Sequence, residues 1–154
     1  MRLKKNGFKE SICSRYLCNY AEIYDEIPEK AHHVLEEIRR GASIGFVHEL
    51  IVYELYYHWK ENRLLFRSSY EIRDFINTYF TGYSIDDEVI ELAVEIKLMG
   101  SKILRESLDL QLRRSLSISD SLTIAIAKRE KIPIVTGDKD LSHVAESMGL
   151  TVIW

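Results

Sequence analysis

The sequence predicts an α/β protein in which helices cover both faces of a central parallel sheet, a three-layer α/β/α sandwich. Short runs rich in β-branched residues alternate with longer amphipathic segments along the chain. This alternation is typical of parallel strands, which need a crossover, usually a helix, to connect them. At 154 residues, without a repeat or an internal linker, residues 1–154 are expected to form one domain.

The first half of the chain carries the clearest helix start and stop signals. Pro28 lies near the start of an amphipathic segment, and Gly41 follows its end. Helices are expected around residues 31–38, 48–59 and 70–80. Strands are expected at residues 11–17, 44–47 and 83–85.

The second half begins with an acidic helix start. Asp86, Asp87 and Glu88 place negative charge where the helix dipole favours it. A polar helix is expected at residues 101–114, and Ser119 or Asp120 is expected to cap the next one. The remaining elements are expected as helices at residues 121–129 and 141–148 and strands at residues 132–135 and 151–154.

Charge and composition exclude some classes of protein. The formal net charge of −3 has no basic excess, so binding to nucleic acid would need a local patch or metal ions. No apolar run reaches the ~18–20 residues that span a membrane, and residues 11–17 are too short and polar for a signal peptide core. We therefore expect a cytoplasmic protein with Cys13 and Cys18 as free thiols.

Three acidic residues fall near predicted strand ends, where parallel α/β sheets form their binding sites. These residues are Glu54, Asp120 and Asp138. Carboxylates that converge repel one another unless a cation binds, and oxygen ligands select hard ions such as Mg²⁺ or Mn²⁺. Such a site suits phosphoryl chemistry. Each acid also has a structural alternative: Asp120 as a helix cap, Asp138 as a turn residue and Glu54 on an exposed helix face.

The segment around these acids resembles the C-terminal half of a PIN domain, the family that includes the VapC-type toxin ribonucleases. The similarity rests on residues 119–127 (SDSLTIAIA) and 134–141 (IVTGDKDL), with residues 50–55 (LIVYEL) upstream. It implies a Rossmann-like sandwich and a Mg²⁺- or Mn²⁺-dependent ribonuclease. Glu54, Asp120 and Asp138 would be three of its four metal-binding acids, with Asp140 auxiliary.

The sequence departs from the family pattern at its start. Members open with a strand that ends in Asp, and Cys13 occupies that place in residues 12–17 (ICSRYL). A thiol is a soft ligand and a poor partner for Mg²⁺. Arg15 adds positive charge that could hold a phosphate, while Glu22 or Asp25 could replace the missing acid. If the missing ligand limits turnover, Cys13→Asp is expected to raise activity.

Two functions follow from the resemblance. The first is an endoribonuclease whose basic residues guide the RNA backbone; the candidates are Arg15, Arg113, Arg114 and Lys139, with Arg105 and Lys128 nearby. The alternative is a catalytically weakened or inactive PIN-like module that binds RNA or another protein. A different phosphotransferase or phosphatase would need an N-terminal strand-end DxD, and the sequence has none.

A tyrosine-rich segment provides a candidate interaction surface. Tyr53, Tyr56, Tyr57 and Trp59 could contact an antitoxin helix or a second subunit, or pack against the core. The family resemblance implies an antitoxin partner, and we expect a homodimer.

Overall fold

In the computed structural model, which describes residues 9–13, 27–109, 112 and 115–154, five strands form one sheet. The strands are β1 (Lys9–Cys13), β2 (Ser43–His48), β3 (Phe80–Tyr83), β4 (Ile134–Val135) and β5 (Val152–Ile153). Their order in the sheet is β3-β2-β1-β4-β5, and every neighbouring pair is parallel. The predicted parallel sheet is confirmed.

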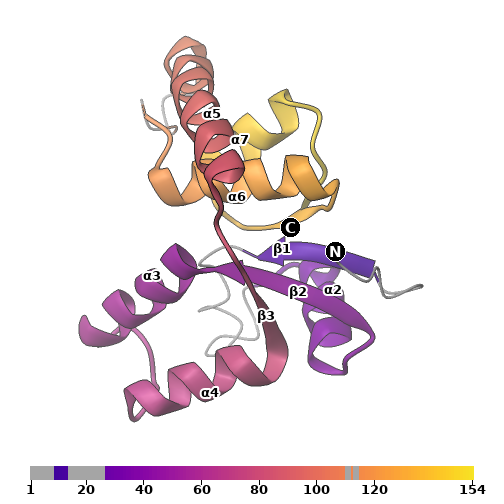
Figure 1. The fold of residues 1–154 in the computed structure, drawn as a ribbon, viewed down its shortest axis with the longest axis vertical. Coiled ribbons are helices and arrows are strands. Elements are labelled where there is room, and N and C mark those ends of the chain that lie inside the picture. Colours follow the sequence, from indigo (N-terminus) through magenta and orange to yellow (C-terminus); the bar gives the residue numbers. More distant parts are fainter. Residues whose placement is uncertain (1–8, 14–26, 110–111, 113–114) are drawn as a thin grey trace.

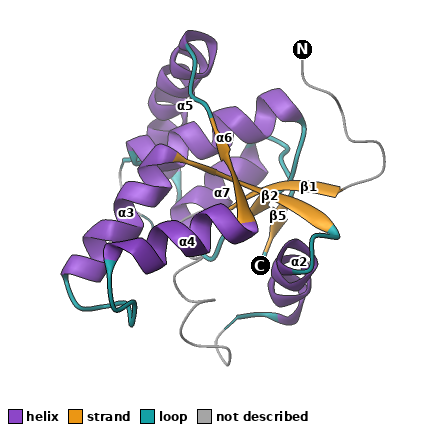
Figure 2. Cartoon of the chain, turned by 60° about the horizontal axis from the view of Figure 1, so that its bottom comes forward, coloured by secondary structure: helices purple, strands orange, loops and turns teal. Residues whose placement is uncertain are grey.

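Six helices in the described part of the chain cover this sheet. They are α2 (Glu29–Arg39), α3 (Glu49–Lys60), α4 (Ser69–Tyr79), α5 (Asp87–Glu106), α6 (Ile118–Glu130) and α7 (Lys139–Ser147). The helices α5, α6 and α7 lie on one side of the strands, and α2, α3 and α4 lie on the other (Figure 1). Figure 2 likewise shows α2 and α5 on opposite sides of the strands. The three-layer sandwich is therefore confirmed.

The alternation of side chains along each strand divides the core between these two layers. Ile12 and Phe46 belong to the apolar cluster that includes residues of α5, α6 and α7. Their neighbours Cys13 and Val47 belong to the second cluster, with residues of α2, α3 and α4. The central strands β1 and β2 are thus buried on both faces, as is typical of strands in a parallel sheet.

The prediction of a separate helix at residues 101–114 was wrong in its extent. The helix α5 continues through Gly100 and ends at Glu106, and Ser107 has extended backbone angles. A Cβ atom at Gly100 would lie 2.7 Å from Leu116 and 2.9 Å from Val144, so this glycine permits close packing rather than breaking the helix. After the helix, the Ser107 hydroxyl accepts a hydrogen bond from the Asp109 amide, which favours a turn.

The cap of α6 also differs from the prediction. Ser117 is the N-cap, and Asp120 lies inside the first turn. The strands β3 and β4 are Phe80–Tyr83 and Ile134–Val135, so the expected strands at residues 83–85 and 132–135 were misplaced or too long. The end of the first predicted strand, residues 14–17, lies outside the described residues. None of the described helices has the length and apolar character needed to cross a membrane.

Candidate functional site

The predicted acidic residues lie along the edge of the sheet where the parallel strands end. Asp138 follows β4, and Glu54 lies in the second turn of α3, which begins directly after β2. Asp120 is in the first turn of α6, one turn before Thr123, whose side chain contacts His48 at the end of β2. This edge is where ligands bind in open parallel α/β sheets.

Asp138 is held firmly by the start of α7. It is the N-cap of this helix, and its Oδ1 accepts hydrogen bonds from the backbone amides of Asp140 (2.9 Å) and Leu141 (3.0 Å). Its own amide donates to Thr136 Oγ1 at 3.1 Å. Asp138 and Asp140 are only 7% and 6% exposed. Two acids are therefore packed around one helix N-terminus, where the dipole favours negative charge.

Asp120 is oriented by a reciprocal pair of hydrogen bonds with Ser117. The Ser117 hydroxyl donates to Asp120 Oδ2 at 2.6 Å, and Ser117 Oγ accepts from the Asp120 amide at 3.0 Å. The Ser117 hydroxyl thus caps the helix through the Asp120 amide and also holds the Asp120 carboxylate. Because Asp120 is half-buried, its carboxylate is fixed at the helix start but still reaches solvent.

The other predicted site residues are more dispersed. Glu54 is half-buried on α3, and Lys139 is exposed directly after Asp138. Arg105 and Lys128 are also exposed. The remaining candidates lie outside the described residues; they are Arg15, Glu22, Asp25, Arg113 and Arg114.

Cys13 ends β1 at the place where the family resemblance expects an aspartate. Its side chain is fully buried, within the apolar cluster shared by α2, α3 and α4. Burial raises the pKa of the thiol to about 12. The thiol is therefore neutral at physiological pH and behaves as a small apolar core residue.

These residues fit a hard metal ion in their chemistry. Asp120, Asp138, Asp140 and Glu54 offer carboxylate oxygens, the ligands that Mg²⁺ and Mn²⁺ prefer. Within the described ranges, however, no three His, Cys, Asp or Glu side chains are grouped closely enough to hold a metal ion. The acids thus share one edge of the sheet, while their assembly into a complete metal site stays a prediction.

The loop that carries Asp138 packs closely against Trp154. A Cβ atom at Gly137 would lie 2.5 Å from two carbons of the Trp154 indole ring. We expect Gly137→Ala to lower the free energy of unfolding by about 1–3 kcal/mol, because this overpacking cannot relax without moving the loop or the ring. Urea unfolding of the single variant, of Trp154→Ala and of the double variant measures the effect.

The double variant should lose little stability beyond Trp154→Ala, because the indole ring that causes the clash is gone. Gly82→Ala is a suitable control, since a Cβ atom there would meet nothing within 4 Å. If Gly137→Ala lowers the free energy of unfolding equally with and without the Trp154 indole, the overpacking against Trp154 is contradicted.

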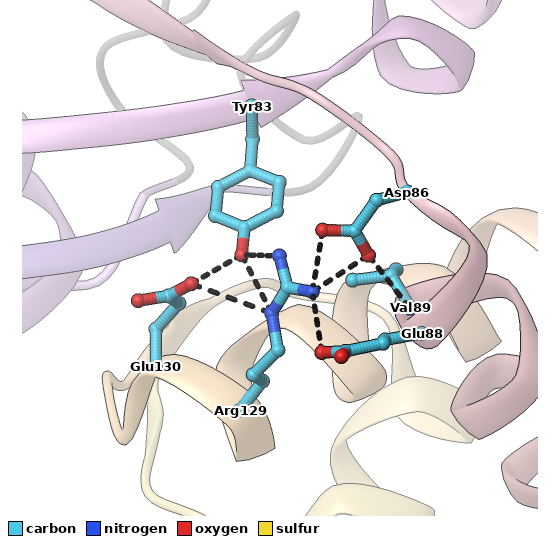
Figure 3. A network of polar contacts seen from close by, with 6 residues as sticks. All are labelled: Tyr83, Asp86, Glu88, Val89, Arg129 and Glu130. Atoms are coloured by element: carbon cyan, nitrogen blue, oxygen red, sulfur yellow. Dashed lines mark hydrogen bonds and ion pairs between the residues drawn. The ribbon is translucent and has the colours of Figure 1, made fainter. Parts of the chain in front are cut away.

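A polar network that the sequence did not predict joins the end of α6 to the end of β3 (Figure 3). The Arg129 guanidinium lies between Tyr83 and Asp86: Nε donates to the Tyr83 hydroxyl at 3.0 Å, and Nη1 lies 2.7 and 2.8 Å from the Asp86 carboxylate oxygens. The Tyr83 hydroxyl also donates to Glu130. Arg129 is 46 positions from Tyr83 and 43 from Asp86 in the sequence, so no local pattern indicates these contacts.

Removal of the Arg129 guanidinium is expected to destabilise the fold in a pH-dependent way. Arg129→Met should lower the free energy of unfolding by about 1–2 kcal/mol through the lost hydrogen bonds to Tyr83. The hydrogen bond from Arg129 also holds the pKa of Asp86 below its usual value. The contribution of Asp86 is therefore complete above the ordinary pKa of aspartate and is lost as the pH falls through the lowered pKa.

The stability difference between wild type and Arg129→Met should accordingly shrink on acidification. Urea unfolding at about pH 7 and about pH 3 measures it, because these values lie above and below the usual pKa of aspartate. An equal difference at both values would show that the Asp86 ion pair contributes nothing.

The tyrosine-rich segment divides between core and surface. Trp59 and Tyr56 are partly buried, where Trp59 Nε1 donates to the Phe66 carbonyl at 2.7 Å and the Tyr56 hydroxyl to the Ser69 carbonyl at 3.2 Å. Tyr53 and Tyr57 are 67% and 51% exposed. Only the latter two are therefore placed to contact a partner.

Comparison with known proteins places this fold among related structures. A family model described as PIN domain matches residues 22–147. VapBC2 from Rickettsia felis, bound to a DNA fragment from their promoter, has a TM-score of 0.59 at 13% identity, covering 93% of this chain and 96% of that one. FitAcB from Neisseria gonorrhoeae has a TM-score of 0.54 at 13% identity, with 92% and 95% covered.

A third similar structure is PAE2754 from Pyrobaculum aerophilum, with a TM-score of 0.51, 20% identity, and 91% and 92% of the two chains covered. No curated protein matches the sequence at a significant level. At these identities the three structures support the fold alone. The family model, in contrast, covers most of the sequence, including Glu54, Asp120, Asp138 and Asp140, and on this basis the chain belongs to the PIN domain family.

Proposed function

We propose that this protein is a divalent-metal-dependent endoribonuclease of the toxin type, which hydrolyses phosphodiester bonds in RNA. One observation carries the proposal: Asp120, Asp138 and Asp140 lie near the strand-end edge of a PIN-family sheet, held by helix starts. Asp138 and Asp140 are more than nine-tenths buried. Carboxylate oxygens at the strand-end edge of a parallel sheet are ligands that hard divalent ions prefer, which favours a role in binding a metal.

In this proposal Asp120, Asp138, Asp140 and Glu54 hold Mg²⁺ or Mn²⁺. When bound, the cation supplies positive charge that stabilises the reacting phosphate. The hydrogen bonds from the Asp140 and Leu141 amides fix the orientation of the Asp138 carboxylate. The exposed Lys139, next to Asp138, would contact the RNA backbone. The same role is proposed for Arg15, Arg113 and Arg114.

An antitoxin partner is part of the proposal. VapBC2 from Rickettsia felis and FitAcB from Neisseria gonorrhoeae are similar in fold to this chain, and they support a toxin–antitoxin setting. The exposed Tyr53 and Tyr57 on α3 are the proposed contact for an antitoxin helix or for a second subunit of a homodimer. We further propose that the protein acts in the cytoplasm, where its RNA substrate would be found.

The test is cleavage of a single-stranded RNA by the purified chain. We expect cleavage with Mg²⁺ or Mn²⁺ and none after a chelator removes the ion. Absence of cleavage with both metals, by protein whose circular dichroism shows the fold intact, would contradict the nuclease function.

A second function is favoured by one observation, the buried neutral thiol of Cys13. The end of β1 contributes no charged ligand through this residue, so the chain could bind RNA or a protein while cleaving weakly or not at all. Fluorescence anisotropy with a labelled RNA distinguishes the two functions, because this alternative predicts metal-tolerant binding without cleavage.

A further inference from the structure

The last residues of β2 and β3 both attach to α6. His48 and Tyr83 are partners in the register of the sheet, so their side chains project from the same face. His48 Nε2 lies 2.9 Å from Thr123 Oγ1, and the Tyr83 hydroxyl lies 3.0 Å from Arg129 Nε. The two contacts on α6 are separated by about 9 Å along the helix axis. The helix is therefore tied to the sheet by polar side chains at two points.

The hydrogen-bond roles at the first point follow from Thr123. A hydroxyl has one proton to donate, and Thr123 Oγ1 donates it to the Ser119 carbonyl at 3.1 Å. Thr123 therefore accepts from His48, whose proton is on Nε2. Burial lowers the pKa of His48 to about 4, which keeps the ring neutral and this arrangement intact at physiological pH.

Burial of the polar His48 imidazole costs free energy that an apolar side chain at this position would not cost. The side chain is fully buried, and its Nδ1 has no hydrogen-bond partner among the described residues. A leucine would fill similar space without leaving a polar atom unpaired. What the imidazole adds is a directional bond to α6, since apolar packing alone is non-directional.

The position that this bond controls is the first turn of α6. Residues 121–127 of the helix are all buried, and the hydrogen bond to His48 adds a directional contact to the packing around them. Asp120 precedes Thr123 by three residues, and side chains at that spacing are neighbours on one helix face. A shift of Thr123 would therefore displace the Asp120 carboxylate from the strand-end edge.

We propose that His48 is a positioning residue for Asp120, which holds the first turn of α6 at the end of β2 through its hydrogen bond to Thr123. The inference rests on the proposed function, in which Asp120 binds the metal. It adds a residue from another strand that supports this ligand without touching the metal.

Three variants of the full chain test the bond. Thr123→Val keeps the shape and removes the acceptor, while His48→Leu removes the donor. His48→Gln retains an amide donor near the position of Nε2. The first two should weaken Mn²⁺ binding, measured by electron paramagnetic resonance, about 10-fold or more, which is typical of the groups that orient metal ligands. His48→Gln should recover most of the affinity.

Two controls separate positioning from general stability. Arg129→Met breaks the second attachment of the same helix, about 13 Å along the axis from Asp120, and should lower Tm without changing Mn²⁺ affinity. Thr78→Val makes the same substitution at an exposed helical threonine and should change neither Tm nor Mn²⁺ affinity. Wild-type Mn²⁺ affinity in Thr123→Val and His48→Leu would overturn the proposal. A loss of affinity that merely follows Tm in all variants, including Arg129→Met, would also overturn it.

Hydrogen exchange on the metal-free protein distinguishes a failure of this inference from a failure of the proposed function. Amides in the first two turns of α6 should exchange faster in Thr123→Val and His48→Leu. In Arg129→Met, faster exchange is expected instead at the C-terminal end of α6. Unchanged exchange in the first two variants overturns the positioning role whether or not Mn²⁺ binds. If the exchange is as expected but Asp120→Asn binds Mn²⁺ as wild type does, the metal role of Asp120 fails and the anchoring by His48 is supported.

Discussion

Replacement of Asp120 by asparagine is expected to lower metal-dependent RNA cleavage by about 100-fold or more. Even groups that only orient a metal ligand change affinity or activity by about 10–100-fold, so the loss of a ligand should cost at least as much. The fold should survive, because the asparagine carbonyl can accept the hydrogen bond from Ser117 and the backbone amide still donates to Ser117 Oγ. Single-turnover cleavage of a labelled RNA measures the effect.

The control for this substitution is Asp74→Asn, at an exposed position of α4 on the opposite layer. It removes the same charge and should leave cleavage unchanged. If both variants lose the same activity, the effect comes from net charge and RNA attraction. If Asp120→Asn cleaves as wild type does, Asp120 is not a ligand and its carboxylate serves only as the acceptor for the Ser117 hydroxyl.

Replacement of Cys13 by aspartate is expected to destabilise the protein by about 3–5 kcal/mol at neutral pH, the cost typical of an uncompensated buried charge. From the sequence alone, a gain of activity is expected if the missing ligand limits turnover, because the family resemblance places an aspartate at this position. The structure supports the opposite outcome, since Cys13 is fully buried in an apolar cluster. Thermal and urea unfolding measure the loss.

The pH dependence identifies the cause of that loss. Burial would raise the pKa of the new carboxyl in the folded state, so the folded state would bind a proton that the unfolded state releases above about pH 4. The variant should therefore be least destabilised in acid and lose stability as the pH rises. Cys13→Ala should show only a small, pH-independent cost. A Cys13→Asp protein with wild-type Tm and tighter Mn²⁺ binding would show that this side chain faces the metal.

The regular part of the fold could be predicted from local patterns. Apolar periodicity and terminal residues such as Pro28 and Gly41 indicate helices, and short β-branched runs indicate strands. The expected separate helix at residues 101–114 was wrong because the continuation of α5 through Gly100 involves a tertiary contact. Gly100 packs against Leu116 and Val144, so the helix continues through a residue that usually weakens one.

The candidate site was predictable to a smaller degree. Local spacing located Asp120 and Asp138 at helix starts, and the structure shows how Ser117 and the amides of α7 orient them. Local patterns did not distinguish Cys13 as a core thiol from Cys13 at a metal site. That distinction depends on which face of β1 carries the side chain and on what packs there.

The sequence by itself determined the α/β class and the order of most elements. These features depend on interactions between residues a few positions apart, which periodicity and capping report. Only the tertiary structure decided that α6 is attached to the sheet by His48 and by Tyr83 through contacts with Thr123 and Arg129. Residues so distant in sequence meet only when the sheet pairs in register and the helix packs across it, so no local pattern reveals their contact.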